Sequence, residues 1–189
     1  YQVLYTRWNG TQLVTANGTP GYENITTSIG DLSNYLLPRI ALSNNMPNIV
    51  FGNSYSYTTQ RGLYFTKWNG TQWTTITGTP GIELVSNTGS AYPYRISIGI
   101  NTQGQPHFVY ETIRYMWWFI IQDDLRATKW NGSAWTNLDT GLSGSVYALA
   151  PAGSNVIVGG NFGFWDGSAW TYNIALWDPG AYAWSFMGS

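Results

Sequence analysis

The chain has 189 residues, enough for one domain with a sizeable core or for part of a larger repeat assembly. Charged residues make up only 9% and the formal net charge is −1, so we expect no nucleic-acid partner. Cysteine is absent, which excludes disulfides, zinc-thiolate sites and cysteine nucleophiles.

Aromatic residues make up 17% of the chain and include 11 Trp. Together with the many Asn, Thr, Ser and Gly residues, this composition is typical of an exposed β-sheet and not of disorder, so we expect an ordered all-β protein. The chain opens on a strand pattern without an initiator Met or signal peptide, as a mature or excised product would. The longest apolar run, 115–121, falls short of the roughly 20 residues that a membrane-spanning helix needs.

The chain begins with a predicted hairpin. Residues 3–8 and 12–15 form strands around Asn9-Gly10, and Asn-Gly favours a type I′ turn because both central residues of that turn need a positive φ. The same Trp-Asn-Gly unit returns at Trp68 and Trp130, at offsets of 60 and 62 residues from one copy to the next. The chain therefore contains an internal repeat.

A weaker fourth copy of this hairpin is expected at Trp177, with a longer loop. The sequence around Trp165 competes with it for that place. We prefer Trp177, because residues 174–176 lead into it as a strand should.

Between the hairpins, a long polar connection over 16–38 is followed by pairs of apolar strands separated by turns. Each pair is completed by a Trp hairpin, so that one unit holds four strands. For the second unit, these are 95–100, 106–111, 125–130 and 134–138. The corresponding strand pairs are 39–43 with 47–52 in the first unit and 145–150 with 156–160 in the third.

Four antiparallel strands that repeat at about 50 to 60 residues predict β-propeller blades. The motif Pro106-His107-x-Val-Tyr, followed by a Trp-Asn-Gly-x-x-Trp hairpin, resembles bacterial extracellular propeller repeats of the sialidase and kelch types. This resemblance implies a propeller fold and an extracellular or cell-surface location. We expect one domain over 1–189, with a half blade at 1–15 and blades at about 39–76, 95–138 and 145–187, or about three and a half blades.

This number of blades raises the question of closure, since closed propellers use about four to eight blades. Either a two-stranded blade completes a small ring, or the blades join another copy, or the chain is a fragment. An open array would leave unpaired sheet edges, which invite strand addition. We therefore expect a homo-oligomer or filament formed through 1–15 and through the apolar run 115–121, read as a loop insertion. If that run is buried, it is instead an extra strand or a plug for the open edge of the propeller.

The longer connections, 16–38, 53–61, 77–94 and 112–124, should emerge on one face of the blades, and we expect a ligand there. Their aromatic rings suit stacking on sugars, with Asn, Thr and Gln as hydrogen-bonding groups. The candidate glycan- or protein-binding residues are Tyr55, Tyr57, Tyr92, Tyr94, Trp117 and Trp118.

Two arginines, Arg39 and Arg95, occupy positions that the repeat makes equivalent on inner strands, and there they can line a central channel and bind carboxylates. The third copy has Ser145 at this position, which favours the alternative that each Arg neutralises a loop carboxylate such as Asp31 or Glu83. The single histidine, His107, lies within a strand and is expected to be structural.

Five Asn-x-Ser/Thr sequons are candidate glycosylation sites: Asn9, Asn17, Asn24, Asn69 and Asn131. The geometry of the hairpin turns already accounts for three of them. Asp123 and Asp124 are expected in a solvated turn, and we expect no metal and no cofactor.

These features predict a noncatalytic extracellular surface or appendage module that binds glycan or protein and associates with itself. One alternative is a structural subunit of an extracellular filament. The other is a sialidase-like glycoside hydrolase, which would need an acid/base pair about 5 to 9.5 Å apart near the arginines.

Overall fold

A computed structural model describes the chain except residues 28, 30, 31, 33–35, 55–59, 117, 118, 153, 154, 166–169, 179, 182, 188 and 189. Within the strands, it describes only the backbone of residues 115, 116, 119–124, 138–146, 149, 151, 164, 171 and 186.

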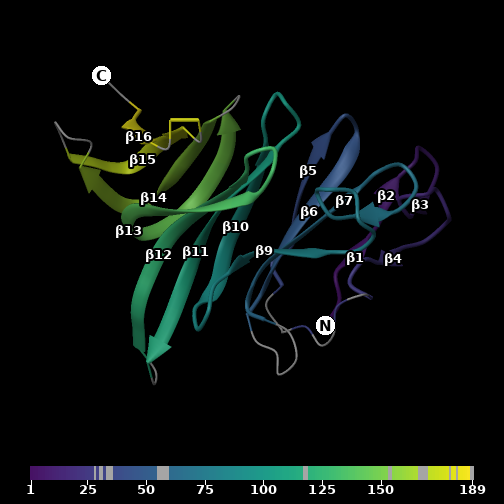
Figure 1. Cartoon of the computed structure of the whole chain (residues 1–189), viewed down its shortest axis with the longest axis horizontal. Coiled ribbons are helices and arrows are strands. Elements are labelled where there is room, and N and C mark those ends of the chain that lie inside the picture. Colours follow the sequence, from purple (N-terminus) through teal and green to yellow (C-terminus); the bar gives the residue numbers. More distant parts are fainter. Residues whose placement is uncertain are drawn as a thin grey trace.

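The described part of the chain forms strands β1 to β16 and no helix (Figure 1). The all-β prediction is therefore confirmed. The strands are β1 Leu4–Tyr5, β2 Arg7–Trp8, β3 Leu13–Val14, β4 Glu23–Asn24, β5 Arg39–Ser43, β6 Met46–Asn53, β7 Gly62–Trp68, β8 Trp73–Thr74, β9 Glu83–Asn87, β10 Tyr92–Ile100, β11 Pro106–Met116, β12 Phe119–Trp130, β13 Trp135–Ala152, β14 Asn155–Trp165, β15 Trp170–Asp178 and β16 Ala183–Phe186.

All the pairings between these strands are antiparallel. Strands β5 to β8 pair in chain order, and β9 also pairs with β7. Strands β10 to β16 pair in chain order as one seven-stranded sheet. Near the N-terminus, β1 pairs with β4 and β2 pairs with β3.

The continuous seven-stranded sheet differs from the separate four-stranded units predicted over 95–138 and 145–187. Strand β13 is 18 residues long. Its first half pairs with β12 from Trp135 to Ser143, and its second half pairs with β14 from Ser143 to Ala152. The two predicted units are joined because only 139–144 separates their strands, whereas 77–94 separates the first unit from the second.

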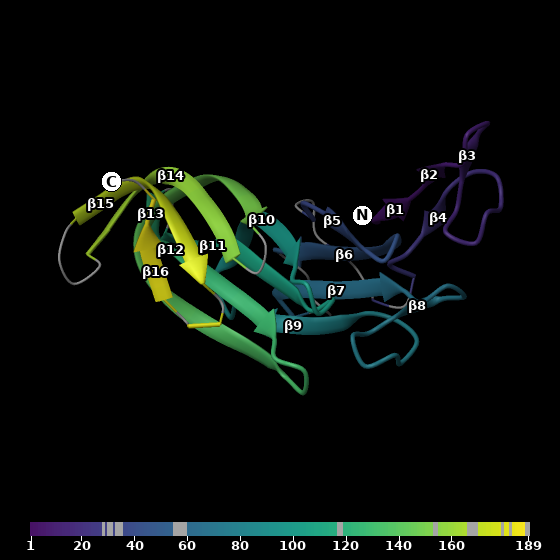
Figure 2. The same cartoon turned by 90° about the horizontal axis from the view of Figure 1, so that it is seen from above.

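Three apolar clusters lie between successive groups of strands. The first joins Tyr5 of the N-terminal region to Phe51 and Trp68, and the second joins Phe65 to Phe108. In the third, Leu125 of β12 packs with Val158 of β14 and Trp177 of β15. The core is therefore a series of inter-repeat layers, and Figure 2 shows the ends of this series, β1–β4 and β14–β16, far apart.

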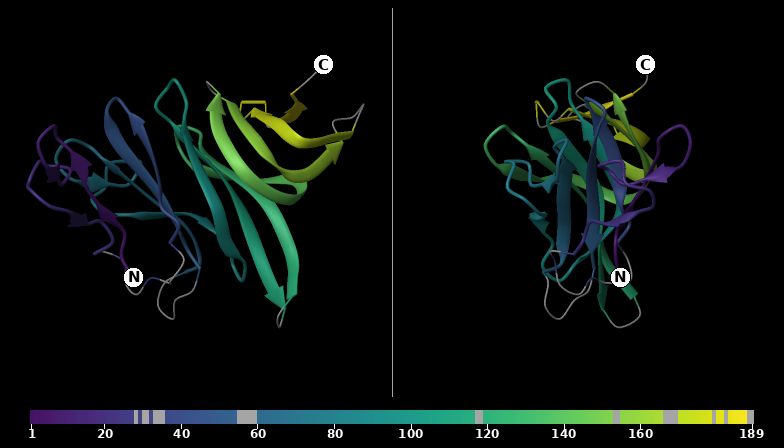
Figure 3. Two further views of the ribbon diagram at one scale, coloured as in Figure 1. Left: turned by 180° about the vertical axis from the view of Figure 1, so that it is seen from behind. Right: turned by 90° about the vertical axis from the view of Figure 1, so that its right-hand side faces the viewer.

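The seven-stranded sheet curls strongly along its length. Because Val109 and Ala127 share a buried cluster with Val156 and Ala175, β14 and β15 pack over β11 and β12 while remaining in the same sheet. Figure 3 shows this curl from behind and from the side. It keeps apolar residues of both halves away from water.

The Trp-Asn-Gly hairpins form where they were predicted, but the type I′ turn is wrong. Trp68 pairs with Trp73, which leaves four residues in the loop. Gly70 has a φ of 101° and Asn69 is not among the residues with positive φ. The Asn69 side chain stabilises the loop instead, since its Oδ1 accepts hydrogen bonds from the backbone N–H of Thr71 and of Gln72, both at 2.9 Å.

The apolar run 115–121 is not a loop insertion. Tyr115 and Met116 end β11 and residues 119–121 begin β12, so the described backbone of the run belongs to these two paired strands. Two pairs, Tyr115 with Ile120 and Met116 with Phe119, extend the ladder that begins at His107 and Lys129, after a register shift between Arg114 and Tyr115. The side chains of this run lie outside the described residues, so a contact with another chain through 115–121 stays a prediction.

Candidate functional site

The first strands of the successive repeats lie next to one another. Strand β10 contacts β5 on one side and β13 on the other. Arg95, predicted to bind carboxylates, lies on this middle strand. The surface formed by these three strands is therefore where residues from different repeats meet.

Arg95 occupies an irregular position on β10. The register with β11 shifts between Tyr94 and Ser97, and Arg95 has a φ of 42°. A positive φ at a non-glycine residue is uncommon and reaims the side chain relative to the regular strand. The bulge thus sets the direction of the Arg95 side chain.

The Arg95 guanidinium is fixed by a buried carboxylate. Its Nη1 donates to both carboxylate oxygens of Glu111, at 3.0 and 3.1 Å. The Glu111 side chain has no exposed surface, whereas 38% of the Arg95 side chain is exposed. Because a buried carboxylate needs a partner, this ion pair holds the guanidinium in place at the surface.

Two tyrosine rings flank the same guanidinium. The Arg95 Cζ lies 5.2 Å from the ring centroid of Tyr94 and 5.1 Å from that of Tyr147, on β13. These distances allow cation–π attraction. Tyr147 is 64% exposed. Tyr94, Arg95, Glu111 and Tyr147 are called the Arg95 cluster below.

The sequence predicted Tyr94 and Arg95 but missed Tyr147 and Glu111. The sequence comparison matched Arg95 to Ser145 of the third repeat. The residue of that repeat that contacts Arg95 is Tyr147, two positions later. The sequence comparison could not show this contact, because a bulge between Val146 and Ala148 shifts the strand register at Tyr147. For Glu111, the available signal was an acidic residue within an apolar strand segment.

Arg39 is not the structural counterpart of Arg95, which corrects the prediction. Arg39 pairs with Val50, as Ser97 pairs with Val109, so Arg39 takes the place of Ser97 in the ladder. Leu37, with a φ of 41°, takes the place of Arg95. Strand pairing and the bulge in β10 decide which residues of the two repeats correspond. The matching Arg-Ile dipeptides therefore gave a sequence alignment that is two residues out of register.

Arg39 contributes to a separate part of the surface. It is exposed, and its Nη1 donates to the carbonyl oxygen of Pro38 at 3.0 Å. Tyr92, two residues before Tyr94 on β10, contacts Arg61, whose Cζ lies 4.5 Å from the Tyr92 ring centroid. The Nη1 of Arg61 donates to the carbonyl oxygen of Ser90 at 2.8 Å. Tyr55, Tyr57, Trp117 and Trp118 lie outside the described residues.

A cavity of about 320 Å³, lined mostly by residues with polar side chains, lies at the end of the sheet that carries the short turns. It opens between the β10–β11 turn, the end of β12 and the β15–β16 turn. Its lining includes Asn101, Gln103, Gln105, His107, Lys129, Trp130, Asn131 and Asp178. The sequence predicted ligands at the long connections and at the inner-strand arginines, and it did not indicate this cavity, which forms from turns distant in sequence.

His107 is buried at the wall of this cavity. Burial, followed by the nearby charge of Lys129, lowers the pKa of His107 from 6.5 to about 4. Its Nε2 has no hydrogen-bond partner, and a Cβ at Gly99 would lie 2.1 Å from that atom. His107 is therefore neutral near pH 7 and packs directly over Gly99.

The five sequon asparagines share one local geometry. In each, the Asn Oδ1 accepts hydrogen bonds from the backbone N–H and the hydroxyl of the Ser or Thr two residues later. The Asn-x-Ser/Thr spacing thus has a structural basis in the turns. Asn24 is half-buried, and Asn9, Asn17, Asn69 and Asn131 are exposed.

Among the residues that the structure describes, no helix is long and apolar enough to cross a membrane. Within the same residues, no three His, Asp or Glu side chains gather where a metal ion could bind.

Comparison with known proteins gives one structural likeness. No protein-family model matches the chain, and no curated protein matches it. The chain is similar to a solved structure described as a new family of polysaccharide lyase, the PL25 ulvan lyase, with a TM-score of 0.61 and 13% sequence identity. The match covers 97% of this chain and 49% of that one, so this chain spans about half the length of the lyase. At this identity, the likeness shows the fold alone.

Proposed function

We propose that this chain is a noncatalytic, extracellular carbohydrate-binding module with propeller-type repeats, and that its Arg95 cluster contacts the sugar. The observation that carries this proposal is the Arg95 guanidinium, held by Glu111 and flanked by the rings of Tyr94 and Tyr147.

The chemistry of the Arg95 cluster suits a saccharide. An exposed tyrosine ring can stack on the apolar face of a sugar, and a fixed guanidinium can donate hydrogen bonds to sugar hydroxyls or to a sugar carboxylate. The ion pair with Glu111 keeps the site close to electrical neutrality, which favours recognition by hydrogen bonding and stacking over general attraction to polyanions. The likeness to a polysaccharide lyase supports a carbohydrate ligand.

The noncatalytic part of the proposal rests on Glu111. A hydrolase of the sialidase type needs one carboxyl group that can give a proton and a second group placed to attack or to activate water. Glu111 is fully buried, and both of its oxygens accept hydrogen bonds from Arg95. Such a carboxylate is enclosed by the protein and engaged by Arg95, and it therefore supports the guanidinium structurally.

Binding to a panel of neutral and uronate-containing polysaccharides tests the proposal, by affinity electrophoresis and titration calorimetry. We expect Tyr147→Ala to weaken binding about tenfold, because it removes one stacked ring. Tyr22→Ala, which removes another exposed ring outside the Arg95 cluster, is the matched control and should bind normally. Equal binding by Tyr147→Ala and by the unaltered chain would contradict the proposal.

Cleavage is the second candidate function, and the polysaccharide lyase likeness favours it. Size-exclusion chromatography of each bound polysaccharide after long incubation separates the two. A polysaccharide of unchanged length supports a binding module. A polysaccharide that is shortened by the unaltered chain but not by Arg95→Lys would show that the chain is an enzyme and would contradict the noncatalytic proposal.

A further inference from the structure

The successive repeats pack through a contact that recurs along the chain. Two residues on the third strand of a repeat form one side of the contact, and in the N-terminal half repeat two residues at the matching positions do so. These pairs are Val3 with Tyr5, Leu63 with Phe65, and Leu125 with Ala127, at offsets of 60 and 62 residues. All six side chains are buried, with at most 8% exposed.

A tryptophan of the following repeat forms the other side. The Trp73 ring lies 5.1 Å from the Tyr5 ring, and the Trp135 ring lies 5.5 Å from the Phe65 ring. Trp184 packs against the buried cluster that contains Ala127. Each repeat therefore buries the third strand of the repeat before it.

The last repeat has the corresponding pair, and no further repeat covers it within the part of the chain that the structure describes. Counting from Trp130 to Trp177, Tyr172 and Ile174 take the places of Leu125 and Ala127. They are 61% and 42% exposed. The Trp170 ring stacks on Tyr172 at 6.2 Å and lies 6.1 Å from Trp165, and both tryptophans are exposed. Trp165, Trp170, Tyr172 and Ile174 form the C-terminal face.

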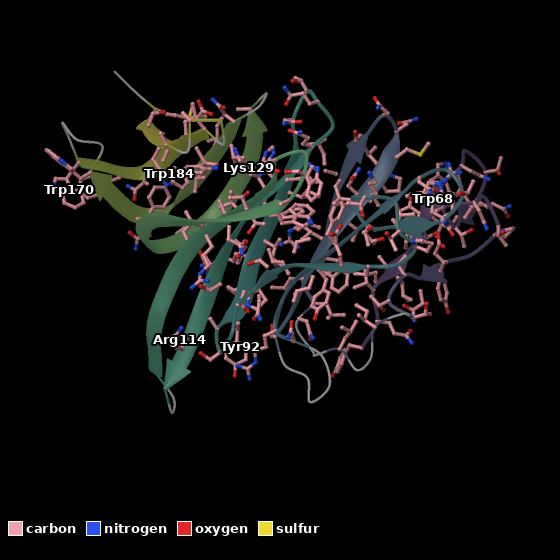
Figure 4. All side chains as sticks on the ribbon, viewed as in Figure 1. Trp68, Tyr92, Arg114, Lys129, Trp170 and Trp184 are labelled. Carbon is pink, nitrogen blue, oxygen red and sulfur yellow. The ribbon has the colours of Figure 1, made fainter. Side chains whose placement is uncertain are left out.

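The N-terminal half repeat, which precedes the first repeat, exposes the opposite half of the contact. Leu4, Trp8 and Leu13 precede Tyr64, Trp68 and Trp73 by 60 residues each. Tyr64 and Trp68 are 5% and 7% exposed, whereas Leu4, Trp8 and Leu13 are 50%, 63% and 55% exposed. Leu4, Trp8 and Leu13 form the N-terminal face. Figure 4 shows Trp170 at one end of the molecule and, at the other end, Trp68, which shares a buried cluster with Val3 and Tyr5 of the N-terminal half repeat.

We propose that the N-terminal face of one copy of this chain binds the C-terminal face of a second copy, head to tail. Such a contact continues the packing that the chain already makes between its own repeats. Contiguous exposed aromatic residues on a protein surface mark interaction sites. A head-to-tail contact generates a closed ring when the rotation between neighbouring copies closes, and an open filament when it does not. Two copies together have about the length of the polysaccharide lyase with the same fold, of which this chain covers 49%.

This proposal goes beyond carbohydrate binding and is tested by mass in solution, measured by light scattering over a concentration series. We expect the 189-residue chain to form a species of twice its 21.1 kDa mass, or longer head-to-tail chains. Ile174→Glu and Leu13→Glu should each give monomers with an unchanged circular dichroism spectrum. Leu42→Glu, which changes another exposed leucine, is the matched control and should still associate.

Mixing the two variants distinguishes a head-to-tail contact from other arrangements. Ile174→Glu keeps an intact N-terminal face and Leu13→Glu keeps an intact C-terminal face, so the mixture should form a dimer through one contact. A monomeric unaltered chain would overturn the proposal. So would association that Leu13→Glu leaves intact, because that result would indicate a contact that does not use the N-terminal face.

Discussion

At the scale of single residues, one asparagine side chain organises each Trp-Asn-Gly hairpin. Asn69 Oδ1 accepts hydrogen bonds from the backbone N–H groups of Thr71 and Gln72 and from the Thr71 hydroxyl, all at 2.9 Å. Asn9 and Asn131 repeat this arrangement. Asp178 Oδ1 accepts equivalent bonds from Gly180 and Ala181 in the hairpin that follows Trp177. The acceptor oxygen is the common requirement.

The first prediction concerns this acceptor. Asn69→Ala should lower the free energy of unfolding by about 1 to 2 kcal/mol, since two backbone N–H groups lose their partner. Asn69→Asp keeps the acceptor and should cost less than half as much. Urea denaturation of both variants measures the difference. Equal losses would mean that the side-chain oxygen does not stabilise the turn.

The second prediction concerns His107. Its folded pKa of about 4 lies below the ordinary 6.5, so between these pH values the unfolded chain binds more protons. Above pH 6.5, His107 is neutral in both the folded and the unfolded chain, so it does not lower the free energy of unfolding. As the pH falls from 6.5 toward 4, the unfolded chain takes up a proton at His107 that the folded chain does not, and the free energy of unfolding decreases. Between pH 7 and pH 5, we expect the free energy of unfolding to fall by about 2 kcal/mol through this group.

His107→Asn supplies the control for this pH dependence, because Asn48 holds the corresponding position in the first repeat and does not titrate. Urea denaturation at pH 7 and at pH 5 should show a smaller difference for His107→Asn than for the unaltered chain. The same difference in both proteins would assign the pH dependence to other groups.

At the scale of elements, Glu83 on β9 connects two repeats. Its Oε1 accepts a hydrogen bond from the backbone N–H of Ile76, and its Oε2 accepts one from Trp135 Nε1 at 2.9 Å. In the preceding repeat, Glu23 Oε1 accepts from the backbone N–H of Ala16. Trp73 Nε1, the counterpart of Trp135 Nε1, is buried without a hydrogen-bond partner.

This asymmetry gives the third prediction. Trp135→Phe should destabilise the chain by about 1.5 to 3 kcal/mol more than Trp73→Phe, because only Trp135 loses a hydrogen bond to a carboxylate. Thermal and urea denaturation of the two variants, which make the same chemical change at repeat-related positions, give the comparison. A larger loss at Trp73 would show that this polar link contributes little.

Local sequence patterns predicted the elements well, because the relevant interactions are close in sequence. The Trp-Asn-Gly hairpins, the paired apolar strands and the all-β composition followed from the turn residues and from alternation. What could not be predicted depends on distant pairing. The register that separates Arg39 from Arg95, the continuous β13 and the contact of Tyr147 with Arg95 are set by strand partners and bulges.

At the scale of the whole molecule, the N-terminal residues cover apolar surface of the next repeat. Val3 and Tyr5 share a buried cluster with Phe51 and Trp68. As the fourth prediction, deletion of residues 1–25 should lower the melting temperature by several degrees, since burial of this surface is lost. The deletion should also increase binding of an apolar fluorescent dye. An unchanged melting temperature would show that the N-terminal residues are not part of the folded core.

The strand β13 has a consequence for the order in which the molecule opens. Its first half pairs with β12 and its second half with β14, and one buried cluster joins β11 and β12 to β14 and β15, so the two halves of the seven-stranded sheet cannot separate without exposing this cluster. The short strands β1 to β4 are not part of this sheet. Repeat proteins unfold in cooperative segments of this kind. Native-state hydrogen exchange should therefore proceed in two stages, with β1 to β4 exchanging first and β11 to β14 exchanging together and last.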